Sequence, residues 1–181
     1  MKNQIVIATS NAKKLTEIQS ILDDMNLEIF PQSHFKIDAT EEPFHTFLEN
    51  ALIKARHASR LSKLPAIADD SGICVDALDG KPGVLSARFA GEPSSDQKNN
   101  EKLLKSLENE SNRKAHYTCV IVFVKHEFDP EPIIAEGIWH GEILKSPRGS
   151  GGFGYDPLFL DHMTEKAVAE LPSEIKNRIS H

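Results

Sequence analysis

Hydrophobic and polar positions follow two different periods along this chain, and they predict strands and helices in turn. Residues 4–10 (QIVIATS) form a β-branched run that ends in small polar residues, typical of a strand that runs into a turn. Residues 13–25 then place apolar side chains at helical spacing, with Asn11 as the candidate N-cap. Residues 27–31 read as a second strand. This strand–turn–helix opening indicates an α/β fold.

The middle of the chain continues this alternation. Residues 47–62 predict a long amphipathic helix with one apolar face, made of Leu48, Ala51, Leu52, Ala55, Ala58 and Leu61. Residues 64–83 read as a strand, an acidic turn, a second strand and a Gly/Pro-rich loop. Residues 96–109 predict a surface helix, preceded by Ser94 and Ser95 as capping candidates.

The last third of the chain adds a hairpin and a glycine-rich loop. Residues 116–125 are apolar on both alternating faces, which predicts a strand buried on both sides, and residues 133–144 are its partner across a connection at 127–132. A Gly-rich loop follows at 146–157, and a last helix begins within 170–181. The order fits a mixed central sheet flanked by helices, with two lobes around a substrate cleft.

Composition narrows the function classes. The 181 residues are 39% hydrophobic and 27% charged, which fits an ordinary globular core and argues against disorder. A formal net charge of −6 disfavours a nucleic-acid coat, because that function usually needs a basic face. A few local lysines and a metal ion can still bind a phosphate-rich small molecule.

Cysteine usage and hydropathy bear on the compartment. Cys74 and Cys119 are far apart and form no CxxC motif, so reduced, buried thiols are expected. The apolar run in residues 1–8 is too short for a signal peptide, and no segment approaches the length of a membrane span. We therefore expect a cytoplasmic protein with no membrane partner.

The first candidate for chemistry is the turn at residues 9–14, TSNAKK. Backbone N–H groups at a helix N-terminus suit phosphate, and Lys13 and Lys14 add positive charge there. A polar turn followed by solvated lysines explains the pattern equally well, since it matches neither a Walker A nor a GxGxxG motif.

Acidic and amide residues around the start of the second helix form another candidate. Glu41 and Glu42 precede this helix, where carboxylates usually just complement the helix dipole. Asn50 and Lys54 are i,i+4 neighbours, so they lie on one side of the helix and can face a common ligand.

The stretch ADDSG (68–72) places two carboxylates side by side at the end of an apolar run. Such a pair suits Mg²⁺, which takes one or two carboxylates together with phosphate oxygens. A nearby carboxylate can also accept a proton from an attacking water. The alternative is an Asx-type turn, in which Ser71 and Gly72 serve only the backbone.

The loop GSGGFGYDP (149–157) favours ligand binding. Its four glycines at positions 149–154 let the backbone approach a ligand, while Phe153 and Tyr155 offer π-faces for a heterocyclic base and Asp156 an acceptor. Taken together, the phosphate turn, the carboxylates and this loop indicate a nucleotide-binding enzyme.

Six segments, in this order and spacing, carry a resemblance that covers essentially the whole chain. They are TSNAKK, FLENALIKA, ADDSG, PGVLSARFAG, GGFGYDP and the terminal ISH. The set resembles the inosine triphosphate pyrophosphatase family, the RdgB-like non-canonical purine NTP pyrophosphatases. The resemblance implies one nucleotide pyrophosphatase domain over 1–181, with an elongated central sheet and two lobes, that works as a homodimer. It also implies Mg²⁺-dependent hydrolysis of ITP, dITP and XTP to the nucleoside monophosphate and pyrophosphate.

The resemblance also implies roles for individual residues. Asp70 matches the proton acceptor, supported by Asp69, and Glu42 and Asp70 match the Mg²⁺ ligands. The phosphates would contact the turn and Lys54, Ser71 would contact the substrate, and the base would lie in the loop and the C-terminal pocket. Arg88 is read as structural or as part of the dimer interface. The implied substrate-binding residues are Thr9, Ser10, Asn11, Ala12, Lys13, Lys14, Lys54, Ser71, Phe153, Gly154, Tyr155, Asp156, Lys176 and His181.

One departure from the family pattern bears on base selectivity. The family's terminal motif is SHR followed by a further helix, whereas the sequence ends at His181, so we expect that helix and the arginine to be truncated. Two other functions stay open: a Maf-like pyrophosphatase for other modified or pyrimidine nucleotides, and a nucleotide-binding module without catalysis.

Overall fold

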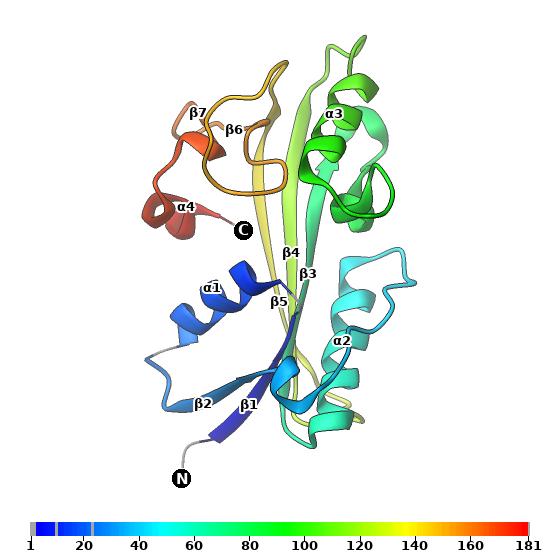
Figure 1. Cartoon of the computed structure of the whole chain (residues 1–181), viewed down its shortest axis with the longest axis vertical. Coiled ribbons are helices and arrows are strands. Elements are labelled where there is room, and N and C mark those ends of the chain that lie inside the picture. The colour runs from blue at the N-terminus through cyan, green and yellow to red at the C-terminus, as the bar shows by residue number, and fades with distance from the viewer. Residues whose placement is uncertain (1–2, 10, 23, 181) are drawn as a thin grey trace. The chain divides into compact units, whose positions relative to one another are not determined.

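The computed structural model describes residues 3–9, 11–22 and 24–180 of the 181 residues. Strands and helices alternate through most of it, and seven strands form one mixed sheet in the order β2-β1-β3-β4-β5-β6-β7 (Figure 1). The fold is therefore the mixed α/β sheet flanked by helices that the sequence predicts. The strands are β1 (Asn3–Ala8), β2 (Leu27–Pro31), β3 (Ala66–Val75), β4 (Lys114–Val124), β5 (Ile133–Ile143), β6 (Phe159–Asp161) and β7 (Lys166–Ala167). The α-helices are α1 (Ala12–Leu22), α2 (Phe47–Ser62), α3 (Asp96–Ser106) and α4 (Ser173–Ile179).

Four short 3₁₀ helices complete the described structure, at Gln32–Phe35, Asp76–Leu78, Gly83–Arg88 and Val168–Glu170. Strands β1 and β2 pair in parallel, as do β1 and β3, while β6 pairs antiparallel with β5 and β7. In this part of the chain no helix combines the length and the apolar character that a membrane span needs.

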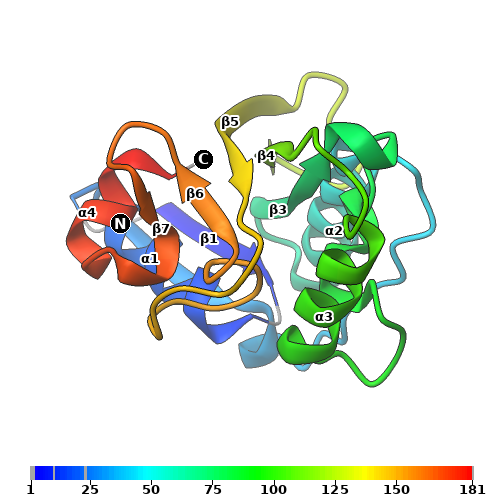
Figure 2. The ribbon, with the colours of Figure 1, turned by 90° about the horizontal axis from the view of Figure 1, so that it is seen from above.

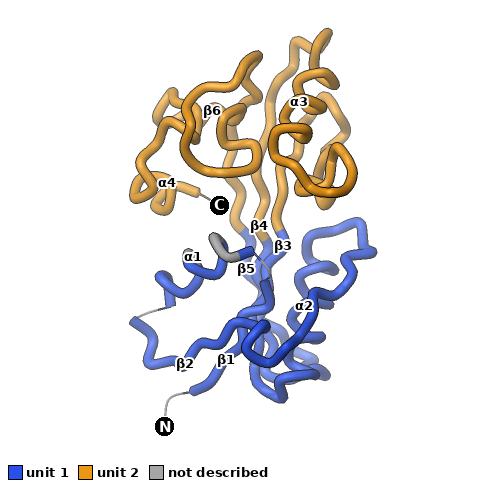
Figure 3. Tube along the Cα trace, in the orientation of Figure 1, with its two compact units in different colours: residues 1–70, 120–136 blue, residues 71–119, 137–181 orange. Residues whose placement is uncertain are grey.

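The chain divides into two compact units, coloured separately in Figure 3. Unit 1 contains residues 1–70 and 120–136, and unit 2 contains residues 71–119 and 137–181. Each unit has its own apolar core. In unit 1, alanines of α2 pack with Val6 and with the valines of β4. In unit 2, Ile73 and Val75 pack with Leu103, Leu107 and the aromatic cluster of Tyr117, Trp139 and Phe159.

Within unit 1, α1 and α2 lie on opposite sides of the strands, as the two views agree (Figures 1 and 2). Both faces of β1 and β3 are therefore covered, and Ile5 to Ala8 are buried. Helix α2 presents Ala51, Ala55 and Ala58 to the core. The small alanines let the helix approach the sheet closely.

Several expectations about helix ends and side-chain burial were wrong. Helix α1 ends at Leu22 instead of 25, and α3 ends at Ser106 instead of 109. Met25 is exposed, so no packing rewards a further turn of α1. Leu48 and Leu61 belong to the predicted apolar face of α2 but are exposed, because the helix contacts the core mainly through its alanines and Leu52. Both cysteines are reduced but only half-buried.

The main correction concerns the acidic turn expected at DDSG. Strand β3 runs without a break from Ala66 to Val75, so Asp69 and Asp70 lie inside a buried strand. Charged residues in a strand interior normally argue for a turn, because an unpaired buried charge is strongly destabilising. Here each carboxylate is paired with a cation, and the strand continues.

Candidate active site

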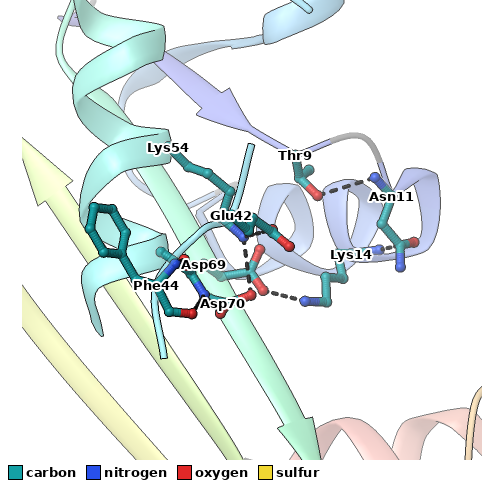
Figure 4. Close-up of polar contacts among 9 residues, drawn as sticks. Thr9, Asn11, Lys14, Glu42, Phe44, Lys54, Asp69 and Asp70 are labelled. Carbon is teal, nitrogen blue, oxygen red and sulfur yellow. Dashed lines mark hydrogen bonds and ion pairs between the residues drawn. The ribbon is translucent and has the colours of Figure 1, made fainter. Parts of the chain in front are cut away.

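The two aspartates of β3 face different helices. Successive side chains of a strand point to opposite faces of the sheet. The Asp69 carboxylate forms an ion pair with Lys14 of α1, and the Asp70 carboxylate accepts a hydrogen bond from Lys54 of α2 (Figure 4). Two adjacent buried charges are thus neutralised separately, one on each face of the strand.

Lys54 bridges two carboxylates. Its Nζ lies 2.8 Å from Oε1 of Glu42 and 3.2 Å from Oδ1 of Asp70 (Figure 4). All three side chains are mostly buried, with exposed fractions of 17% for Lys54, 24% for Glu42 and 9% for Asp70. The two carboxylates therefore converge on a single position that a cation occupies.

Asn50 holds this arrangement in place. It is fully buried, and its Nδ2 donates to Oδ2 of Asp70 at 3.3 Å. The same amide accepts from the backbone N–H of Phe44 at 3.1 Å and donates to the Phe44 carbonyl at 3.2 Å. Asn50 thereby ties the segment that carries Glu42 to the strand that carries Asp70. The i,i+4 spacing of Asn50 and Lys54 predicted that both could face a common ligand. In the structure both donate to the Asp70 carboxylate, and the common ligand stays a prediction.

The pKa of Asp70 is raised above its usual value. Burial is the main cause, because it penalises the charged carboxylate; Lys54 opposes this shift, and the negative charge of Glu42 adds to it. A carboxylate with a raised pKa is a better proton acceptor near neutral pH than an ordinary surface aspartate. Position and proton affinity both suit Asp70 to act as a general base.

The turn before α1 has the geometry of a helix N-terminus. Asn11 caps α1, since its Oδ1 accepts from the backbone N–H of Lys14 at 3.3 Å, and its own N–H donates to Oγ1 of Thr9 at 3.2 Å. The predicted N-cap is therefore confirmed. Ser10 lies outside the described residues, as do the side chains of Ala12 and Lys13, so the structure places Thr9, Asn11 and Lys14 of this group.

Glu49 serves the helix and not the cluster. Its carboxylate accepts from Oγ1 of Thr46 at 2.6 Å, and its N–H donates back to that oxygen, which forms an N-terminal cap on α2. This residue illustrates why an acidic residue near a helix start is usually structural.

In unit 2 the glycine-rich loop closes on itself around Asp156. Oδ2 of Asp156, which is buried, accepts from the backbone N–H of Phe153 at 2.9 Å and from Nζ of Lys176 at 2.7 Å. The same Nζ lies 4.3 Å from the centroid of the half-buried Phe153 ring. Phe153, Asp156 and Lys176 are thus brought together as predicted. His181, the other member of the expected base pocket, lies outside the described residues.

Tyr155 occupies a different environment from the one expected for a stacking ring. It is buried in the core of unit 2, and its hydroxyl donates to the Ser86 carbonyl at 2.8 Å. Burial, followed by the negative charge of Asp96, raises its pKa well above the usual range. The ring therefore supports the loop from beneath, and its predicted contact with a base stays a prediction.

Two further predicted residues have less distinctive surroundings. Ser71 follows Asp70 along β3 and is half-buried, and Arg88 ends a 3₁₀ helix and is also half-buried. Their predicted roles in substrate contact and at a dimer interface stay predictions.

Comparisons with known proteins place these features in a family context. The family model described as "Ham1 family" matches residues 5–181. A dITP/XTP pyrophosphatase of Nitrosomonas europaea is 55% identical over 99% of this chain and 88% of its own length, and one of Chromobacterium violaceum is 54% identical over 100% and 92%. Among solved structures, a HAM1 protein from Coxiella burnetii has a TM-score of 0.95 and 45% identity, covering 99% of this chain and 92% of its own.

Proposed function

This chain belongs to the Ham1 family, and from that premise we propose that it is a nucleoside triphosphate pyrophosphatase acting on non-canonical purine nucleotides. The reaction converts ITP, dITP or XTP to the nucleoside monophosphate and pyrophosphate. The observation that carries the proposal is the buried cluster of Glu42, Lys54 and Asp70, which combines a cation position with a carboxylate of raised pKa.

Glu42 and Asp70 fit a divalent metal ion. Among the described residues no group of three or more His, Cys, Asp or Glu gathers as a metal site, so a protein cage of many ligands is absent there. Two carboxylates that converge on one cation position fit Mg²⁺, which keeps several waters and takes the remaining ligands from substrate phosphates. When bound there, Mg²⁺ would neutralise triphosphate charge during attack at the α-phosphorus.

The chain's own residues would perform the remaining tasks. Asp70 would orient the attacking water and accept its proton, while Asn50 holds the Asp70 carboxylate in place through a hydrogen bond. Lys54 and Lys14 would contact the phosphates as positive charges, and Asp69 would hold Lys14 next to the strand. The capped N-terminus of α1 adds backbone donors for phosphate oxygens, supported by Thr9 and Asn11.

We assign base recognition to residues 153–156 and Lys176. Phe153 offers its ring, and the Lys176 ammonium over that ring offers a donor for a 6-keto oxygen. Adenine has an amino group at this position, so the ammonium, which also donates to Asp156, would face a second donor instead of an acceptor, which penalises ATP. We further propose that the enzyme works in the cytoplasm as a homodimer and takes no nucleic-acid polymer as substrate.

A pyrophosphate-release assay tests the proposal. With Mg²⁺ present, ITP and XTP should be hydrolysed much faster than ATP. Faster release from modified or pyrimidine nucleotides would instead support the Maf-like alternative. Tight ITP binding with no release of pyrophosphate would show a nucleotide-binding module without catalysis.

A further inference from the structure

Two side chains of helix α3 form hydrogen bonds with the backbone of one residue of the glycine-rich loop, Gly154. The backbone N–H of Gly154 donates to Oδ2 of Asp96 at 2.7 Å, and the Gly154 carbonyl accepts from Nδ2 of Asn100 at 2.9 Å. Asp96 and Asn100 are four residues apart, so they share one face of the helix. One peptide segment of the loop is therefore fixed by two side chains of a separate element.

The backbone of the preceding residue, Phe153, is also fixed by hydrogen bonds. Its N–H donates to Asp156, and its carbonyl accepts from the Asp156 N–H at 3.2 Å. Together with the two bonds from α3, these contacts engage all four backbone polar groups of Phe153 and Gly154. These four bonds fix the backbone from which the Phe153 ring projects.

Gly154 differs from the other glycines of the loop. A Cβ on Gly149 or Gly151 would lie 2.6 Å or 3.0 Å from the Ala169 backbone, and one on Gly152 would lie 2.0 Å from Oδ2 of Asp156. These three glycines permit close packing inside the protein. At Gly154 no described atom outside residues 153–155 lies within 4 Å of a Cβ position. The open position in the loop is thus the one that α3 holds.

Asn100 keeps its bond to Gly154 in an unfavourable setting. Its Oδ1 is buried and has no hydrogen-bond partner among the described residues. A buried acceptor without a donor destabilises a fold, and such an atom in a native protein calls for an explanation. The presence of an asparagine at position 100 is explained if the protein needs the Gly154 backbone geometry that this side chain fixes.

We propose that Asp96 and Asn100 are positioning residues that fix Gly154, and through it the Phe153 ring, for binding of a purine base. This inference rests on the proposed function, since it concerns the base site of the same enzyme. It assigns neither residue a contact with the reacting atoms. Removing these hydrogen bonds should weaken the part of binding that depends on the base and leave the part that depends on the phosphates unchanged.

The test compares two ligands that separate these contributions. Dissociation constants for IMP, which carries the base, and for inorganic tripolyphosphate, which lacks it, are measured by calorimetry. Asp96→Ala and Asn100→Leu should weaken IMP binding about tenfold, as expected if the released loop holds the ring in the binding geometry about a tenth of the time, and change tripolyphosphate binding less than twofold. Gln97→Ala is the matched control, because Gln97 bonds only to the exposed Glu101 on the same helix.

Thermal unfolding separates positioning from simple stability. Asn100→Leu removes the buried unsatisfied oxygen and also the donor to the Gly154 carbonyl, two effects of opposite sign, so its unfolding midpoint should change little while IMP binding weakens. Unchanged IMP binding in both variants, or equal weakening for both ligands, would overturn the proposal. So would a wild-type protein that does not bind IMP. A wild type that binds IMP but releases no pyrophosphate from ITP would refute the proposed function and leave this inference standing.

Discussion

Replacing Asp70 with Asn should separate activity from stability. The substitution keeps the shape of the side chain and removes its charge and its ability to take a proton. Asp70 sits in a buried cluster with Lys54 and Asn50, so little else in the site needs to move. The matched comparison for stability is Asp69→Asn, one residue away on the opposite face of the same strand.

The structure gives the sign of each effect, and general magnitudes give its approximate size. A positioned general base contributes roughly 10²–10⁴-fold to a rate, so Asp70→Asn should lower kcat at least about 100-fold, or about 2.7 kcal/mol. Loss of a metal ligand acts in the same direction. Stability should change less than in Asp69→Asn, because loss of an unfavourably buried charge offsets the donor-to-donor contact of the new amide with Lys54 or Asn50, and Lys54 keeps its bond to Glu42.

Asp69→Asn should behave differently. It leaves Lys14, whose side chain is 25% exposed, without its charged partner, and should lower the free energy of unfolding by about 1.5–3 kcal/mol. Pyrophosphate release from ITP and urea unfolding in EDTA measure the two quantities for both variants. An Asp70→Asn enzyme within tenfold of the wild-type rate, or one as destabilised as Asp69→Asn, would refute the reasoning.

Three other predictions concern metal, backbone and pH. EDTA should abolish pyrophosphate release but barely shift the unfolding midpoint, because Lys54 itself bridges Glu42 and Asp70; a large shift would show a structural metal. Gly149→Ala should destabilise the protein by about 2–4 kcal/mol in urea unfolding, since its φ is +78° and the new Cβ would meet the Ala169 backbone. Gly154→Ala should destabilise it by only about 1–2 kcal/mol, since its φ of +59° is unfavourable for alanine but the new Cβ would lie in open space. Burial raises the pKa of Asp161, but hydrogen bonds from Thr164 and Trp139 outweigh it and the net pKa is lowered. Stability from Asp161 is therefore present above its unfolded pKa of about 3.9 and lost as pH falls through the lower folded value, so Asp161→Asn should flatten the acid limb of the unfolding free energy against pH.

Local patterns predicted most of the fold because they were strong and independent of distant contacts. The helical spacing over residues 47–62 gave both ends of α2 correctly, and the β-branched runs located β1, β2, β4 and β5. Strands β6 and β7 were not predicted, since they contain three and two residues and carry no periodic signal. They exist only through pairing with β5 and with each other.

The glycine-rich loop shows a second limit of sequence reasoning. Its four glycines suggested room for a ligand, but three of them allow close contact with Ala169 or Asp156. Sequence alone cannot tell a glycine that admits a ligand from one that admits the protein's own backbone. The contacts of Asp96 and Asn100 were unpredicted for a related reason, since they lie more than 50 positions from Gly154.

The two adjacent aspartates of β3 marked the site in the sequence, and they also led to the wrong prediction of a turn. Two neighbouring carboxylates suggested a turn, because a single environment could not easily neutralise both. A strand removes this difficulty, since its period of two sends Asp69 and Asp70 to different faces, and the helix on each face brings its own lysine. The same geometry makes the two residues unequal. Asp69 pairs with Lys14, whereas Asp70 shares Lys54 with Glu42. Burial raises the pKa of Asp70; Lys54 opposes this shift and Glu42 adds to it.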